Sequence, residues 1–278
     1  MGFAAQALST PPRLCLLTGI RLPSYFLIPF GIAKHPKTGS TWHLPRLSSL
    51  ASGSDASTTA PPPPGSDSGS TSKQPSRTAT GTHYVGSYEA LAYISDLAKP
   101  AYRKLIPFRW KEDSSLKVSD MVWREDMASF VLEMLRKSIT QDLKYLASRP
   151  AAYIVACEIH ERISAHDQIA AVLWLGPNGD TSTQGPPLDG AANPEEPDPP
   201  PYAMDHYKDR LVPCFNLVAL LEHTHLRTLR ETAPIQYGDK LAVIKAKRPT
   251  VKVQLELWKL LGFLAHRTGD AMKNGKGD

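Results

Sequence analysis

The stretch "MASFVLEMLRKSITQDLKYLAS", residues 127–148, decides the fold class that we expect. Its apolar residues recur every four positions, at Met127, Val131, Leu135, Ile139 and Leu143. Residues four apart lie on the same face of an α-helix, so this stripe predicts an amphipathic helix. We expect the helix to run from about residue 120 to residue 148, because the residue before a proline, here Pro150, disfavours helical backbone.

Helical spacing recurs on both sides of this stretch. Upstream, "SYEALAYISDLAKP" predicts a helix that Ser87 caps and that ends before Pro100. Downstream, residues 151–163 carry apolar residues at helical spacing and predict a second helix. Two more helices are expected, one capped by Asn216 and one that begins near Thr250. The inward face of the last helix is predicted to carry Val253, Leu257, Leu260 and Leu264.

Strand signals are fewer and shorter. The apolar run "IAAVLWL", residues 169–175, fits either a buried strand or more helix, because periodicity does not separate the two. Residues 210–215 and 240–247 predict short strands, and "AYRKLIPFRWK", residues 101–111, predicts an extended or turning segment. The expected fold is therefore mainly α with two or three short β-strands, and an α+β arrangement is the alternative.

Two segments rich in proline and small polar residues interrupt the chain. Residues 51–82 contain almost nothing apolar beyond alanine, and residues 177–205 are acidic and Pro-rich. Such segments bury too little apolar surface to offset the entropy lost on ordering, so both are expected to be disordered. We therefore predict a leader in residues 1–50, a linker in 51–82, and one domain formed by 83–176 and 206–278, with 177–205 as an insertion.

The net charge of +5 is unevenly distributed along the chain. Residues 1–82 carry a net +5, residues 83–176 are neutral, residues 177–205 carry −6, and residues 206–278 carry +6. The positive charge therefore belongs to the leader and to the last quarter. Such segregation indicates more about partners than the overall charge does.

The first 50 residues resemble an organellar targeting segment in composition. The first acidic residue is Asp55, and five basic residues precede it: Arg13, Arg21, Lys34, Lys37 and Arg46. Basic, Ser-containing segments without acidic residues are typical of mitochondrial transit peptides. Two alternatives stay open. One is a membrane-associated segment at residues 14–33, which Arg21 and two prolines disfavour, and the other is a secretory signal.

The stretch "CEIHERISAH", residues 157–166, combines a thiol, two imidazoles and two carboxylates. If it is helical, Cys157 and His160 lie one turn apart, which permits a nucleophile and its base. No third residue with recognisable spacing orients the pair, so a charged helix surface is the preferred interpretation. A zinc site that joins Cys157 and His160 to Cys214 and His223 or His225 is a further alternative without a confirming motif. We predict neither a metal nor a cofactor.

Two basic stretches are the candidate binding sites. Near the C-terminus, "KAKRPTVK" supplies Lys245, Lys247, Arg248 and Lys252 between a predicted strand and a predicted helix. Such a loop can bind phosphates, helped by the free N–H groups of the helix start. Cations and aromatic residues alternate in the other stretch, as in many RNA-binding surfaces, and the candidates there are Arg103, Lys104, Arg109 and Trp110. The alternative is that its aromatic residues anchor the core.

These observations favour a binding protein over an enzyme. We expect a non-catalytic mitochondrial accessory factor, located in the matrix or at the inner membrane, that docks through its basic C-terminal surface. The expected partner is a mitochondrial ribonucleoprotein, as in ribosome- or RNA-associated gene expression, or a respiratory-complex assembly intermediate. No small-molecule substrate is identified. An enzyme that uses the Cys157/His160 surface and a membrane-associated scaffold that retains residues 14–33 are the alternatives.

Overall fold

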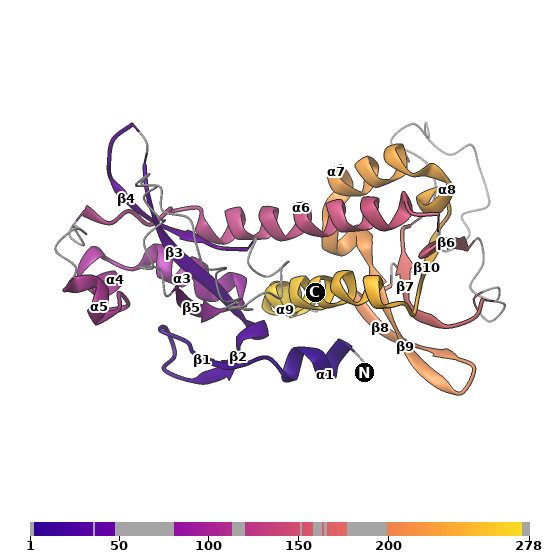
Figure 1. The fold of residues 1–278 in the computed structure, drawn as a ribbon, viewed down its shortest axis with the longest axis horizontal. Helices are drawn as coiled ribbons and strands as arrows, with labels where there is room; N and C mark the ends of the chain where they lie inside the picture. Colours follow the sequence, from indigo (N-terminus) through magenta and orange to yellow (C-terminus); the bar gives the residue numbers. More distant parts are fainter. Residues whose placement is uncertain are drawn as a thin grey trace, which may run out of the picture. The chain divides into compact units, whose positions relative to one another are not determined.

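The computed structural model describes residues 3–35, 37–47, 81–112, 120–150, 152–157, 163, 166–176 and 199–273. The side chains of residues 99, 100, 109 and 266–273 lie outside this description. The chain divides into two compact units. The N-terminal unit is Gln6–Val131, and the C-terminal unit is Leu132–Asp278 together with Met1–Ala5. The dividing point falls within the helix α6, Met127–Ala147. Figure 1 labels the elements of both units.

The predicted mainly α fold is wrong. The described residues form an α+β structure with ten strands in three sheets. The strands that sequence reasoning missed lie mostly in the first 85 residues, where a leader and a linker were expected. The expected disorder in residues 51–82 and 177–205 concerns segments of which 51–80 and 177–198 lie outside the described residues. At their ends the expectation is wrong, because Thr82 begins the strand β5 (Thr82–Val85) and residues 202–205 belong to the strand β8 (Tyr202–Tyr207).

A five-stranded sheet forms the centre of the C-terminal unit. The strand order is β6-β10-β7-β9-β8, and every neighbouring pair is antiparallel except β7 and β9, which are parallel. The strands are β6 (Ile154–Cys157), β7 (Ile169–Trp174), β8 (Tyr202–Tyr207), β9 (Arg210–Asn216) and β10 (Leu241–Lys245). The strands β7 and β10 are nearly continuous apolar runs, as expected of strands that are buried on both faces of a sheet.

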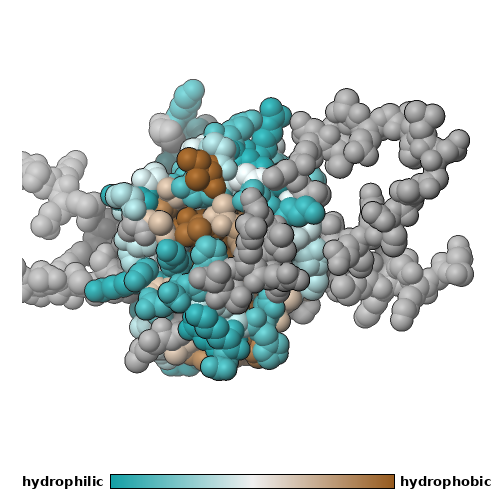
Figure 2. Space-filling model, turned by 90° about the vertical axis from the view of Figure 1, so that its right-hand side faces the viewer, coloured by the Kyte–Doolittle hydropathy of each residue, from teal (hydrophilic) through white to brown (hydrophobic). Residues whose placement is uncertain are grey.

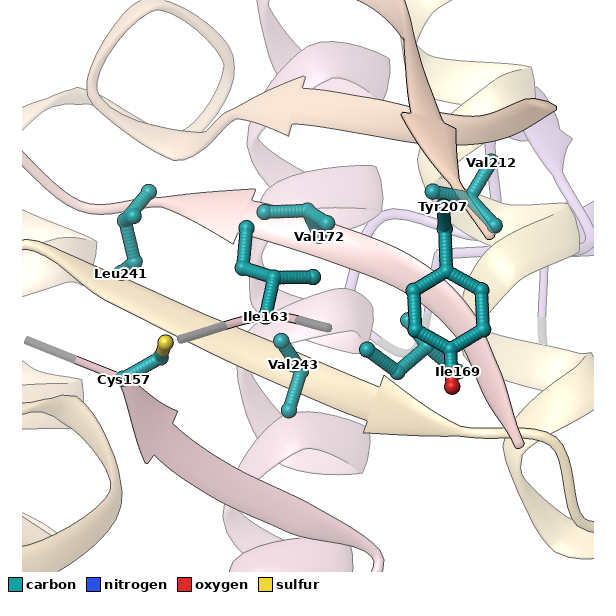
Figure 3. Packing of buried hydrophobic residues seen from close by; sticks show 8 residues of the cluster. All are labelled: Cys157, Ile163, Ile169, Val172, Tyr207, Val212, Leu241 and Val243. Atoms are coloured by element: carbon teal, nitrogen blue, oxygen red, sulfur yellow. The ribbon is translucent and has the colours of Figure 1, made fainter. Parts of the chain in front are cut away.

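One face of this sheet carries a buried cluster that Figure 3 shows in close view. Val172 of β7 and Val243 of β10 are opposite each other in the ladder and are fully buried. The complete cluster is Cys157, Ile163, Ile169, Val172, Tyr207, Val212, Leu241 and Val243. Because each large aliphatic side chain contributes about 1.5–3 kcal/mol when it is fully buried, this layer is a main source of the stability of the unit.

The helices of the C-terminal unit match the predicted periodicity. The stripe of α6 is buried, and so are the four predicted inward residues of α9 (Val251–Lys273). The predicted cap at the start of α7 (Leu217–Thr232) is confirmed, because the Asn216 side chain accepts a hydrogen bond from the Ala219 N–H at 3.1 Å. Two short helices complete the unit, α8 (Pro234–Tyr237) and the 3₁₀ turn η5 (Arg248–Thr250).

Three local predictions are wrong. The helix expected over residues 151–163 is replaced by β6, because residues 154–157 pair with β10 along their whole length, and tertiary pairing outweighs local helical spacing. Residues 101–111, expected to be an extended or turning segment, contain most of α4 (Lys99–Lys104) and all of α5 (Phe108–Lys111). The helix expected from residue 120 begins at Met127. The strand alternative for residues 169–175 is confirmed by β7.

The N-terminal unit contains two small antiparallel sheets. One pairs β1 (Pro12–Leu14) with β2 (Arg21–Pro23), and the other has the order β4-β3-β5. Its strands are β3 (Leu27–Lys34), β4 (Thr41–Pro45) and β5 (Thr82–Val85). The same unit contains the 3₁₀ turn η1 (Ser24–Phe26), the helix α3 (Tyr88–Asp96), α4 and α5, and the division between the units falls within the helix α1 (Phe3–Leu8). Two of the three strands in the larger sheet therefore come from residues 1–50, and the leader function of those residues stays a prediction.

A buried histidine in β4 centres the core of the N-terminal unit. His43 is inaccessible to solvent, and its ring nitrogens lie 2.8 Å from the Tyr102 hydroxyl and 2.8 Å from the Thr82 hydroxyl. Aromatic rings surround it at centroid distances of 5.3–5.7 Å, contributed by Phe30, Tyr84, Trp110 and Trp123. Burial lowers the pKa of His43 to about 3, so the neutral ring is the one that the folded state accommodates.

This burial predicts a stability that depends on pH. The pKa of His43 is lower in the folded chain than the ordinary value of 6.5, so its contribution is complete above pH 6.5 and is lost as the pH falls towards about 3. His43→Gln, which keeps a donor and an acceptor, should remove this part of the pH dependence. Urea unfolding between pH 7 and pH 4, followed by the fluorescence of Trp110 and Trp123, measures it. His35→Gln is the control, and an unchanged pH slope in His43→Gln contradicts the prediction.

A strained residue interrupts α7 at Glu222. Its backbone has φ 62° and ψ 167°, a region that is essentially confined to glycine. The buried Arg136 of α6 stabilises the kink, because its Nε donates to the Leu220 carbonyl at 2.9 Å and its Nη1 lies 2.5 Å from Glu222 Oε1. The interaction holds a carbonyl that the interrupted helix leaves without its usual partner.

Two substitutions at this kink separate backbone strain from the ion pair. Both Glu222→Gly and Glu222→Ala remove the carboxylate that binds Arg136, but only glycine adopts the observed backbone without steric cost. We expect Glu222→Gly to be more stable than Glu222→Ala by about 1–2 kcal/mol, within the range for such strained residues. Equilibrium urea unfolding of the two variants measures the difference. Equal stabilities, or a less stable glycine variant, would show that the kink is not strained.

Candidate anion-binding site at one end of the five-stranded sheet

Three loops of the C-terminal unit meet at one end of its sheet. They are the bend that precedes β7, the two-residue turn between β8 and β9, and the loop that follows β10. The sheet register places Lys245 opposite Ile169 and Tyr207 opposite Arg210. The loop after β10 also bonds to the bend, since the Ala246 N–H donates to the Gln168 carbonyl at 2.5 Å. Segments far apart in sequence are thus fixed side by side.

These loops bring five cationic residues to the same end of the sheet. Lys245, Lys247 and Arg248 were predicted from the basic run, and the structure places the last two on the surface. Lys208 and Arg210, from the β8–β9 turn, were missed. The signal for them was present, because two strand-like runs separated by two polar residues form a hairpin, and residues around a hairpin turn lie at the end of a sheet.

A shallow hollow lies between the bend before β7 and the β8–β9 turn. Its volume is about 490 Å³, and its lining consists of Asp167, Gln168, Tyr207, Lys208, Asp209 and Arg210. This volume is within the range of small-molecule sites. Lys247 adjoins the lining, because its Nζ lies 3.4 Å from Gln168 Oε1. In Figure 2, which views the molecule from the right-hand side of Figure 1, hydrophilic residues make up most of the coloured surface.

The buried ring of Tyr207 supports the two cations of the turn. Lys208 Nζ lies 5.3 Å and the Arg210 guanidinium 5.4 Å from the centroid of this ring, which are cation–π distances. The Tyr207 hydroxyl donates to the His166 carbonyl, and Arg210 Nη2 donates to the Ile169 carbonyl. These contacts fix the floor of the hollow and leave further N–H groups of the arginine fork for a ligand.

Opposite charges are also present in the hollow. Lys208 Nζ lies 3.2 Å from Asp167 Oδ1, and the Asp167 side chain is 90% exposed. Hydrogen bonds to Tyr207 and then to Asp167 raise the pKa of Lys208, so it is cationic at neutral pH. The lining alone contains two acidic and two basic residues, and the neighbouring Lys245, Lys247 and Arg248 make the local charge positive. An exposed ion pair of this kind contributes little to stability and can be exchanged for a ligand.

The loop that carries Lys247 is held by a buried threonine. The Thr250 hydroxyl lies 2.7 Å from the Lys245 carbonyl oxygen and 2.8 Å from the Lys247 carbonyl oxygen. Gln254 Nε2 in turn donates to the Thr250 carbonyl at 3.1 Å. Because Thr250 is fully buried, the loop between β10 and α9 has a fixed shape, and Lys247 and Arg248 project from a rigid base.

Lys252, the fourth residue of the predicted basic run, has a different role. Its Nζ lies 2.7 Å from Asp142 Oδ2 of α6 and 3.7 Å from Glu256 Oε1, so it joins α9 to α6. Burial and the neighbouring Asp142 raise the pKa of Glu256, whose carboxylate lies 3.4 Å from the Ser138 hydroxyl. Burial also lowers the pKa of Lys259, one turn further along α9, to about 7. This partly buried charge cluster connects two helices, and Lys252 is not available to a partner in the way that Lys247 is.

The contrast between these two lysines is testable. Lys252→Met leaves Asp142 and Glu256 without their cation and should lower the free energy of unfolding by about 1–3 kcal/mol. Lys247→Met should change it by less than about 0.5 kcal/mol, as is usual for exposed residues. Chemical denaturation of both variants measures the difference. If the two variants were equally stable, Lys252 would have no structural role and would count as part of the exposed basic surface.

The second predicted basic stretch lies in the N-terminal unit and is mostly structural. Trp110 is 4% exposed and packs against His43, and Tyr102 is buried with its hydroxyl bonded to the same histidine. The alternative that the aromatic residues of this stretch anchor the core therefore holds for these two. Arg103 and Lys104 are exposed in the last turn of α4, and the side chain of Arg109 lies outside the described residues.

The alternative of a Cys157/His160 pair stays a prediction for its imidazole half, because only its thiol lies among the described residues. Cys157 ends the strand β6 and is buried in the apolar cluster, where Figure 3 shows it near Leu241 and Val243, and His160 lies outside the described residues. A buried thiol in apolar surroundings lacks the features of a reactive one. Burial likewise raises the pKa of Cys214 to about 11.

The described part of the chain contains neither a cluster of metal ligands nor a membrane-spanning helix. No group of three His, Cys, Asp or Glu residues there is arranged to hold a metal ion. His225, a candidate ligand, instead lies 3.2 Å from Glu133 and 3.3 Å from the Thr140 hydroxyl. No helix in that part is long and apolar enough to cross a membrane, and residues 14–33 contain β2, η1 and most of β3.

The fold and the site define an α+β protein with a shallow polar hollow, beside exposed cations, at the end of a five-stranded sheet. Comparison of the chain with protein families, with curated proteins and with solved structures gives no match.

Proposed function

We propose that this chain is a non-catalytic accessory factor of mitochondrial gene expression that docks onto a ribonucleoprotein by binding its RNA. The observation that carries the proposal is the position of cations from two separate loops at one end of the sheet. Lys208 and Arg210 line the hollow, Lys247 lies beside its Gln168, and the exposed Arg248 follows Lys247 in the same loop. Phosphates supply most of the affinity in RNA binding, and clustered Lys and Arg residues are what they bind.

The mitochondrial part of the proposal rests on the leader composition. Five basic residues precede the first acidic one, and this pattern is typical of import into mitochondria. The docking part rests on rigidity as well as charge, because Thr250 and Tyr207 hold the two cationic loops in fixed positions. A rigid site loses less conformational entropy when it binds its partner.

The proposal predicts that affinity for RNA resides at this end of the sheet. The triple variant Lys208→Ala/Lys247→Ala/Arg248→Ala should bind a fluorescent single-stranded 20-mer RNA at least about tenfold more weakly in anisotropy titrations. Its salt dependence should also fall by about 2 in the slope of log K against log salt, since each phosphate contact to a single strand contributes about 0.7. The change in slope reports lost phosphate contacts and is not produced by partial unfolding.

A matched control removes three exposed cations elsewhere. Arg103 and Lys104 lie in the N-terminal unit, and Lys240 lies at the other end of β10. Arg103→Ala/Lys104→Ala/Lys240→Ala should bind RNA like the unaltered chain. An equal loss in both triple variants would mean that binding follows net charge and not the hollow. A pull-down from mitochondria with and without RNase gives the independent test, because partners that are retained through RNase favour docking on protein, as in respiratory-complex assembly.

A further inference from the structure

We infer that the hollow lined by Lys208 and Arg210 binds the terminal phosphate monoester of an RNA chain, in preference to the phosphodiesters along it. This inference rests on the proposed function and names the part of the RNA that the site recognises. It is carried by the ion pair inside the hollow, by the number of donors that meet there, and by the backbone of the residues that present them.

The ion pair sets the charge that a ligand must bring. Asp167 already places one negative charge 3.2 Å from Lys208 Nζ, and the Asp209 carboxylate also lines the hollow. A phosphodiester carries one negative charge. If it replaces the Asp167 carboxylate as the partner of Lys208, the negative charge beside Lys208 does not increase. A phosphate monoester carries about −1.5 to −2 near neutral pH and does give a gain. The two carboxylates thus disfavour weakly charged anions more than strongly charged ones.

The donors also match the oxygens of a terminal phosphate. A monoester presents three terminal oxygens, and a diester presents two. Lys208 and Arg210 line the hollow from the turn and from the start of β9, and Lys247, from the loop after β10, lies beside Gln168 of the lining. The arginine fork can bind two oxygens in parallel while a lysine binds the third. Such a set of charge-assisted hydrogen bonds is complete only for the monoester.

Backbone geometry indicates that the lining is adapted for binding at some cost in stability. Lys208 has φ 51° and Gln168 has φ 56°, in the left-handed region where residues other than glycine are uncommon. Glycine would adopt this backbone without steric cost at either position. It would, however, remove the Lys208 side chain from the hollow and the Gln168 side chain that contacts Lys247. Strained residues of this kind cluster at ligand sites.

The test compares three RNA 12-mers of one sequence. The first has a 5′-phosphate and the second a 5′-hydroxyl, and both carry a fluorophore at the 3′ end. The third has a 3′-phosphate and carries the fluorophore internally. Anisotropy titrations use the full chain. We expect the phosphorylated end to bind about tenfold more tightly, the gain of about one charge-assisted hydrogen bond. Asp167→Asn should narrow this preference by strengthening the binding of the hydroxyl form. Lys208→Gly should abolish the preference and raise the melting temperature.

The outcomes distinguish this inference from the proposed function. If all three oligomers bind equally tightly, RNA binding stands and the preference for a terminal phosphate is overturned. If none binds, the proposed function itself fails. If inorganic phosphate alone binds in calorimetry while the oligomers bind equally, the hollow takes a free phosphate and the assignment to an RNA end is overturned. A Lys208→Gly variant that loses both the preference and thermal stability would also contradict the argument from strain.

Discussion

The pairing of β10 with β6 on one side and β7 on the other is the constraint on which the C-terminal unit depends. Through it, a strand near residue 243 joins segments that precede it by about 70–90 residues in sequence. The fully buried Val243 and Ala242 lie on opposite faces of that strand, so β10 contributes to the apolar layers on both sides of the sheet. The same pairing carries Lys245 and Lys247 to the bend before β7, so the candidate site is a direct consequence of the sheet register.

Helices were predictable where one amphipathic face was long enough to be recognised. The stripes of α6 and α9 extend over several turns, and Asn216 marks the start of α7 in the usual way. The short strands were not predictable, because β6 has four residues and β5 has four, too few for either period to stand out. The two strands within residues 27–45 were missed for a different reason. The basic, acid-free composition of this segment fits a targeting leader, and its apolar residues also form two paired strands.

The candidate site was only half predictable, because charge in a sequence does not state what each charge contacts. Lys247 and Lys252 belong to the same basic run, but Lys247 contacts a solvent-exposed glutamine and Lys252 contacts a partly buried aspartate on another helix. Lys208 and Arg210, in contrast, were not predicted to bind a ligand. Two cations around an ordinary turn do not indicate a site in the sequence, and their place in the hollow follows only from the sheet. A run of cations therefore identifies a binding surface only after tertiary contacts have removed those with structural partners.

The distribution of backbone strain separates the roles of these contacts. Among the described residues, four other than glycine have a left-handed backbone, and two of them, Gln168 and Lys208, line the hollow. A third, Glu222, has its carboxylate paired with the buried Arg136, so a contact within the fold compensates for its strain. The contacts of Lys208 with Tyr207 and its exposed ion pair with Asp167 are weak interactions. A turn of this geometry is most stable with glycine, so the lysine at this position costs stability, and the proposed binding of a phosphate would give that cost a role.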